Sequence, residues 1–130
     1  MVAGVGGLVL SVRISRQHWQ ALLDELDDAR RQRHLLTYRA LIERLDLPTP
    51  AMQTLTAALE HLAALDARAE RPLRSALVIS QGASRLPRTG FFDCVMRLGR
   101  FSGASDGVAA ASWHAAEVVR VFEFDYPVDV

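Results

Sequence analysis

The chain has 130 residues, of which half are hydrophobic and 23% are charged. This balance favours one folded domain, spanning residues 1–130, and argues against intrinsic disorder. The 15 basic and 15 acidic side chains cancel to a formal net charge of zero, so the chain is not one of the strongly basic proteins that hold phosphate backbones by bulk charge.

The chain opens with an apolar, glycine-rich stretch at residues 1–12. This stretch has no basic n-region and is too short to span a bilayer, so we expect a flexible start, with a targeting segment as the alternative. The β-branched and aliphatic residues at 8–14 predict a short strand. Residues 1–14 are therefore expected to lead into the first helix.

The first predicted helix covers residues 16–33, with Ser15 as its N-cap. Its apolar residues recur at helical spacing and form one stripe, whereas the other face is charged. The members of this stripe are Trp19, Leu22, Leu23 and Leu26.

Two further helices follow. Thr37 is placed to cap a short helix that ends before Pro48. Thr49 is expected to cap the next helix, with Pro50 at its first position and its end near residue 69. The buried stripe predicted for this third helix consists of Met52, Leu55, Leu59, Leu62 and Ala63.

The second half of the chain alternates apolar runs with loops. Residues 75–80 are expected to form a buried strand, and residues 85–90 a basic loop. A short helix is predicted over 91–98, a last helix over 108–124 and an irregular tail over 125–130. The inner face predicted for the last helix consists of Ala111, Ala115, Val118, Val119 and Phe122.

This order predicts a mostly helical α+β fold, with one or two short strands. Residues 35–92 have the layout of a winged helix-turn-helix: a short helix, a tight turn, a longer helix, then a strand and a loop. An ordinary α+β domain with two consecutive helices is the alternative, because helix pairs joined by short turns are common.

Part of this region resembles the DNA-binding domain of alkylguanine-DNA alkyltransferases and alkyltransferase-like proteins. Residues 36–42, Leu-Thr-Tyr-Arg-Ala-Leu-Ile, are similar to the family's threonine-tyrosine-glycine opening. Residues 53–59 are similar to its recognition helix, residues 72–79 occupy the place of its proline-rich approach to the active site, and residues 86–91 are similar to its glycine-phenylalanine loop. The resemblance covers residues 35–92 and implies a winged helix that docks on DNA.

The departures from the family pattern concern its chemistry. Residues 75–80 contain neither the reactive cysteine nor the adjacent histidine that alkyl transfer requires. Cys94 lies downstream, in a predicted helix, where a packed side chain is expected. Gln53 stands where the family has its base-stack arginine, and Thr56 where it has a helix glycine. Alkyl transfer and base flipping are therefore not expected, whereas docking in a groove remains open.

The residues expected to contact DNA or RNA come from three segments. The third helix would present Gln53, whose amide can pair with adenine, and the small side chains of the same face. Hydroxyl groups near the starts of the two helices and two arginines at a wing tip would contact phosphates. The predicted nucleic-acid-binding residues are Thr37, Tyr38, Thr49, Gln53, Thr54, Ala57, Arg85 and Arg88.

The alternative to nucleic acid is a protein partner. Trp113, Phe124 and Tyr126 could anchor an adaptor, an inhibitor or a homodimer through a helical face. The sequence shows no zinc-ligand spacing, no dinucleotide fingerprint and no nucleophile elbow, so we expect a non-enzymatic regulatory module without metal or cofactor, with an undetected enzyme as the alternative.

The arginine content and the single cysteine indicate the kind of organism and the cellular compartment of the protein. All 15 basic residues are arginine, a bias typical of bacterial proteins from GC-rich genomes. The single cysteine, Cys94, excludes an intramolecular disulfide and suits a reducing compartment. A cytoplasmic protein without a membrane segment is therefore expected.

Overall fold

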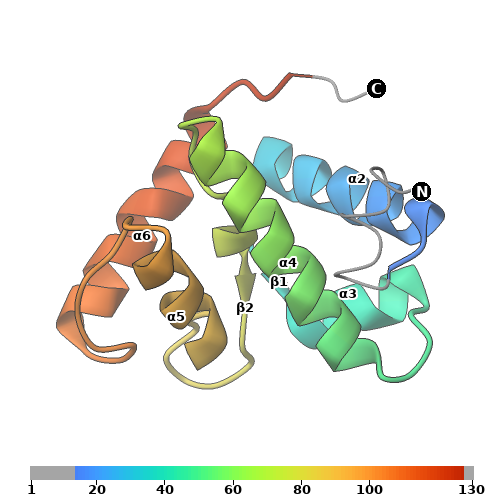
Figure 1. Ribbon diagram of the computed structural model, residues 1–130, viewed down its shortest axis with the longest axis horizontal. Helices are drawn as coiled ribbons and strands as arrows, with labels where there is room; N and C mark the ends of the chain where they lie inside the picture. The colour runs from blue at the N-terminus through green and yellow to red at the C-terminus, as the bar shows by residue number, and fades with distance from the viewer. Residues whose placement is uncertain (1–13, 128–130) are drawn as a thin grey trace.

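The computed structural model describes residues 14–127 (Figure 1). Most of the predicted strand at residues 8–14 lies outside this range, and so do the last three residues of the predicted tail. The helices are α2 (Arg16–Gln32), α3 (Tyr38–Leu45), α4 (Ala51–Arg68), α5 (Thr89–Arg97) and α6 (Val108–Glu123), with a 3₁₀ helix, η1 (Arg74–Leu77). Within the described residues, no helix has the length and apolarity needed to cross a membrane.

The sheet is small and parallel. β1 (Leu36–Thr37) pairs with β2 (Val78–Ile79), with Leu36 opposite Val78 and Thr37 opposite Ile79. The mostly helical α+β class is therefore confirmed. Residues 80–88 form a loop, and in the part of the chain described here β2 pairs only with β1.

Both of the first two predicted N-caps are confirmed. The Ser15 side chain accepts a hydrogen bond from the backbone N–H of His18 at 3.0 Å. Thr37 does the same for Ala40 at 3.1 Å. Each cap satisfies a backbone donor that the helix itself leaves unpaired, which fixes where the helix begins.

The predicted start of α4 is wrong by one residue. Pro50, not Thr49, is the N-cap, and it offers no side-chain acceptor to the first turn. Its carbonyl oxygen accepts from the backbone N–H of Thr54 at 3.1 Å. The backbone N–H groups of residues 51–53 therefore lack a side-chain cap, and no acidic residue lies in this turn.

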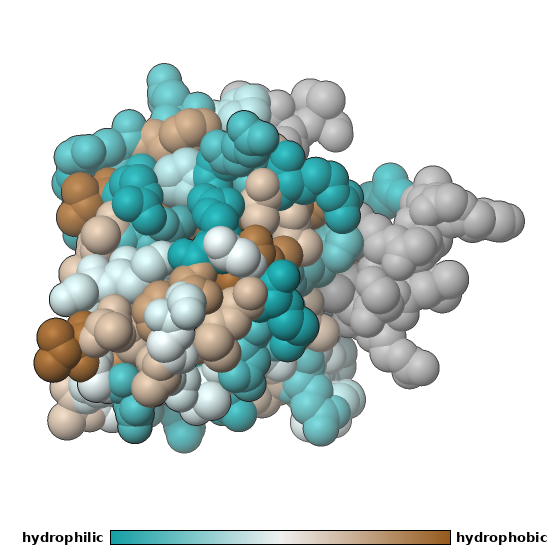
Figure 2. All heavy atoms as spheres, turned by 60° about the vertical axis from the view of Figure 1, so that its left-hand side comes forward, coloured by the Kyte–Doolittle hydropathy of each residue, from teal (hydrophilic) through white to brown (hydrophobic). Residues whose placement is uncertain are grey.

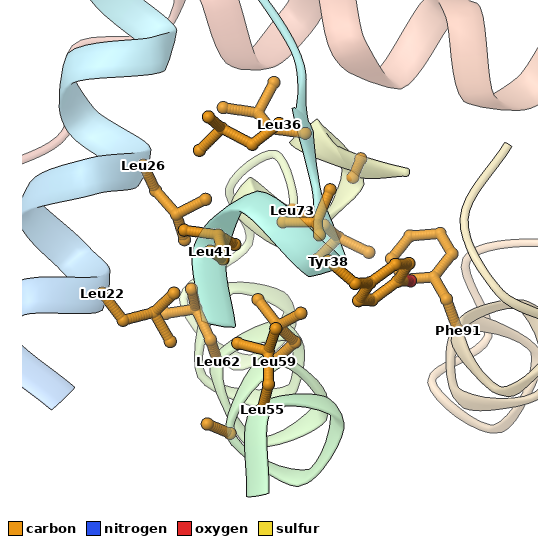
Figure 3. Close-up of a cluster of buried hydrophobic side chains, with 14 of the residues drawn as sticks. Leu22, Leu26, Leu36, Tyr38, Leu41, Leu55, Leu59, Leu62, Leu73 and Phe91 are labelled. Atoms are coloured by element: carbon orange, nitrogen blue, oxygen red, sulfur yellow. The ribbon is translucent and has the colours of Figure 1, made fainter. Parts of the chain in front are cut away.

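The core lies between α2, α3 and α4, with η1 and β2 behind them (Figures 1 and 3). Leucines from all three helices point toward one another in Figure 3, and burial of each contributes about 1.5–3 kcal/mol. Leu22, Leu26, Leu41, Leu55 and Leu62 are fully enclosed.

The strand predicted over residues 75–80 is mostly not a strand. The segment is buried as expected, but its first part is η1 and only Val78–Ile79 pair in the sheet. Local partners explain the difference: the Arg74 backbone N–H donates to Asp66 at 3.0 Å, and the Ser75 hydroxyl donates to the Leu59 carbonyl at 2.6 Å. These contacts fold the backbone against α4 before it can extend.

The inner face predicted for α6 is also largely wrong. The buried residues are Ala110, His114, Glu117, Val118 and Val121. Ala111, Ala115 and Val119 are exposed, so the helix is rotated relative to its apolar stripe. His114 donates from Nε2 to the Ala76 carbonyl at 2.7 Å, and Glu117 accepts from the Leu73 backbone N–H at 2.7 Å. These buried partners hold two polar residues inside.

Candidate nucleic-acid interface

The parallel sheet brings two of the predicted site residues together. Tyr38 follows β1 directly, and the loop that carries Arg88 follows β2. Because parallel strands end at the same edge of a sheet, the two segments meet there. The Arg88 backbone N–H donates to the Tyr38 hydroxyl at 3.0 Å, and the Arg88 guanidinium carbon lies 5.8 Å from the centre of the Tyr38 ring.

Two hollows border this pair. A groove of about 380 Å³ runs between α3, the start of α4 and the loop after β2. Its lining residues are Tyr38, Arg39, Ile42, Glu43, Met52, Ser80, Gln81 and Arg88. A smaller hollow of about 160 Å³ also has Tyr38 and Arg88 on its wall, and Thr56, Glu60 and Ser75 add polar groups to it. Tyr38 and Arg88 thus stand between the two spaces.

The Tyr38 phenol remains neutral at physiological pH. Burial raises its pKa above the ordinary value of 10, an effect that the Arg88 backbone N–H and the Arg88 charge oppose. Since the hydroxyl oxygen already accepts from Arg88, its proton is available for donation to a further acceptor. Tyr38 is only 6% exposed and its ring packs in the core, so the hydroxyl is the group that it can offer to a ligand.

Positive charge predominates around the groove. Arg39 and Arg88 line the groove, and Arg85 lies three residues before Arg88 in the loop after β2. All three are exposed, and none of them lies within 4.0 Å of a carboxylate among residues 14–127. Two carboxylates, Glu43 and Glu60, line the hollows. Glu60 is already 3.7 Å from Arg97, so it is partly neutralised. The lining of the groove therefore has two arginines and one carboxylate, in a chain that is neutral as a whole.

The start of α4 adds donors beside this groove. Gln53 is exposed there, next to the uncapped first turn. Figure 1 shows this end of α4 and the loop after β2 along the same lower edge of the molecule. Uncapped N–H groups at a helix start favour an anion, because the helix dipole adds to their partial charge.

The other predicted contact residues are less available. Thr37 uses its hydroxyl as the α3 cap, and the Thr54 hydroxyl donates to the Pro50 carbonyl at 2.9 Å. Thr49 is exposed in the turn. Ala57 is half-buried and borders a cleft between α4 and α5, which also contains Cys94. The outward face of α4 is therefore open mainly around Gln53.

The predicted interaction anchors lie elsewhere and are mostly engaged. Trp113 packs against Phe91, Phe92 and Phe101, with ring centres 5.6–6.4 Å apart. The Tyr126 hydroxyl donates to the Pro72 carbonyl at 2.6 Å. The Phe124 ring is 4.6 Å from that of Tyr126. Trp113 thus packs α6 against α5 and the loop after it, and Tyr126 holds the segment after α6 at Pro72.

Arg39, Ser80 and Gln81 are groove residues that the sequence reasoning missed. Their signal is topological: Arg39 comes two residues after the end of β1, and Ser80 and Gln81 come directly after β2. A two-residue strand gives too short an alternation to predict, so this edge could not be located from the pattern.

Comparison with protein-family models, curated proteins and solved structures finds no significant match for this chain. Residues 14–127 contain no group of three or more histidine, cysteine or acidic side chains arranged to hold a metal ion. The geometry of the groove and its charges are therefore the basis for a functional proposal.

Proposed function

We propose that this chain is a nucleic-acid-binding module that uses the surface formed by Tyr38, Arg39, Gln53, Arg85 and Arg88, here called the Tyr38 surface. The observation that carries the proposal is the pair of exposed arginines, Arg39 and Arg88, that line the groove without a carboxylate partner among the described residues, with Arg85 exposed in the same loop as Arg88. Elsewhere many arginines are paired, for example Arg44 with Glu25 at 2.9 Å.

Each part of the Tyr38 surface suits one component of a nucleic acid. The arginines contact phosphates, with planar groups that match phosphate oxygens. The first turn of α4 receives a further phosphate oxygen. Gln53 reaches a base edge, where its amide fits adenine. In this arrangement α3 and α4 act as a helix-turn-helix, and residues 80–88 take the place of the wing.

The proposal also sets the strength of binding. Three arginine–phosphate contacts give a log–log salt slope of about −2.7 on a duplex and about −2.1 on a single strand. Affinity is then modest at physiological salt and rises steeply as salt is lowered. The single thiol of Cys94 is buried, which suits a reducing compartment, and we propose a cytoplasmic location.

The test is fluorescence anisotropy with a labelled duplex and a labelled single strand of the same sequence, from 20 to 200 mM salt. Arg85→Gln/Arg88→Gln should weaken binding on the order of tenfold at 50 mM salt and reduce the slope to about −0.9 on the duplex. The backbone N–H of residue 88 remains to bind Tyr38, so the fold is kept.

The control is Arg31→Gln/Arg68→Gln, which removes the same charge from exposed positions near the other end of the molecule. It should leave at least half of the affinity. Equal losses in both pairs would show attraction to net charge alone, and no binding by the wild type at 20 mM salt would end the proposal.

A further inference from the structure

The outward face of α6 has an unusual composition for a helix exposed on the surface. Between residues 108 and 119 it carries no charged side chain, since His114 and Glu117 are both buried. Val108 is 83% exposed and Val119 is 48% exposed. The exposed residues of this stretch, here called the α6 face, are Val108, Ala109, Ala111, Ser112, Ala115, Ala116 and Val119.

Figure 2 turns the side with α5 and α6 toward the viewer, and apolar colour extends over this part of the surface. Isolated apolar residues are normal on a protein surface, but a run of about 18 Å along one helix without a charge is typical of a covered face. On its inner side α6 buries a glutamate and a histidine, so this helix has polar residues inside and apolar residues outside, which is the reverse of the usual arrangement for a surface helix.

We propose that the α6 face packs against the α6 face of a second copy, with the two helices antiparallel about a two-fold axis. Small side chains at residues 111, 112, 115 and 116 allow the axes to approach to about 8 Å. In this register Val108 lies opposite Val119 of the second copy, and Ser112 lies opposite Ala115. The two valines thus pack at the ends of the contact, and the small side chains pack at its centre.

Charges at the two ends of the α6 face favour this partner over an unrelated one. Asp106 precedes the helix, is exposed and has no ion-pair partner among the described residues. Arg120 follows the face, and its side chain remains 54% exposed although it pairs with Glu117. Antiparallel pairing places acid beside base at both ends and aligns the helix dipoles favourably.

The size of the face predicts a weak dimer. A single helix pair of this length lies at the lower end of the area that specific interfaces bury. Association is therefore expected with a dissociation constant on the order of tens of micromolar. The Tyr38 surface is formed by α3, the start of α4 and the loop after β2 and has no residue of α6, so dimer formation and nucleic-acid binding are separable.

Sedimentation velocity of the full chain from 5 µM to 1 mM tests the proposal. The wild type should change from monomer to dimer over this range. Ala115→Glu and Ser112→Lys each place like charges near the two-fold axis, and each should raise the dissociation constant at least tenfold. Both positions are exposed, and glutamate and lysine are good helix formers, so the fold should survive.

Charge complementation then identifies the partner as a second copy in this register. Since residue 112 faces residue 115 across the axis, an equimolar mixture of the two variants should dimerise, and so should the double variant Ser112→Lys/Ala115→Glu. Gln17→Glu, on the exposed side of α2, is the control and should dimerise like the wild type. A wild type that is monomeric at 1 mM, or variants that fail to complement, would overturn the pairing.

Discussion

Helices α2 and α6 are of nearly equal length, 17 and 16 residues, and both lie at the surface, yet they distribute their polar residues differently. The one charged residue that α2 buries, Arg30, lies in its last turn, whereas α6 buries His114 and Glu117 in its middle. α2 buries leucines such as Leu22 and Leu26. α6 buries Glu117 and His114 among its inner residues. The exposed residues of α2 are Arg16, Gln17, Gln20, Asp24, Asp28, Arg31 and Gln32.

The difference in buried residues shows two ways in which a surface helix can stabilise the fold, by apolar burial and by hydrogen bonding. The charged outer side of α2 suits water, and its leucines supply hydrophobic stability. The inner side of α6 instead supplies hydrogen bonds to the backbone of the segment around η1, whose packing against α4 and α6 leaves backbone groups to be satisfied. Its outer side is then apolar because, in our account, protein covers it.

The comparison predicts its largest effect at Glu117. The carboxylate is fully buried, accepts from the Leu73 backbone N–H and lies near the Arg100 and Arg120 guanidinium groups. Glu117→Ala should lower the free energy of unfolding by about 3–5 kcal/mol, measured by urea denaturation, because it leaves buried donors unpaired.

Glu117→Gln is the matched variant, since its amide oxygen can still accept from Leu73. It should lose roughly half as much stability as Glu117→Ala. A loss below about 1 kcal/mol for the alanine variant would show that the buried polar residues of α6 contribute little to stability, which would contradict the contrast drawn between α6 and α2.

On α2 the corresponding effect comes from an apolar group. Leu26→Ala should cost about 3 kcal/mol in the same urea experiment, because Leu26 is fully enclosed and truncation leaves a cavity. Asp28→Ala, on the exposed side of the same helix, should change stability by less than about 0.5 kcal/mol. Equal costs at the two positions would contradict the assignment of the faces.

A smaller effect concerns pH. Burial lowers the pKa of His114 below its ordinary value of 6.5, against the opposing Ala76 hydrogen bond and the Glu117 charge. The folded state therefore binds fewer protons than the unfolded state, and stability should fall as pH drops below about 6.5 toward the lower folded pKa. Burial lowers the pKa of His61 in the same direction.

His114→Gln retains a donor for the Ala76 carbonyl and should flatten this pH dependence, measured as the urea midpoint between pH 7.5 and 5. His34→Gln is the control and should keep the slope of the wild type. An unchanged slope in His114→Gln would show that another group titrates.

The contrast also explains what could be predicted from the sequence. The ends and the inner face of α2 follow from Ser15 and from leucines at helical spacing, since local hydrogen bonds and apolar burial act there together. The inner face of α6 could not be predicted by periodicity, because the partners that stabilise Glu117 and His114 inside come from residues about 40 positions away.

The candidate site was predictable in part for the same reason. Tyr38 and Arg88 were identified from local features, but their contact depends on the pairing of β1 with β2, two strands of two residues each. Arg39 and Gln81 join the groove through that pairing and not through any local motif.

Hydrogen–deuterium exchange of the full chain with and without a saturating duplex at 20 mM salt tests the central claim most directly. The account predicts slower exchange at residues 51–54 and 88–91, which border the Tyr38 surface, and unchanged exchange along α6. Protection confined to α6, or none at a saturating concentration, would contradict it.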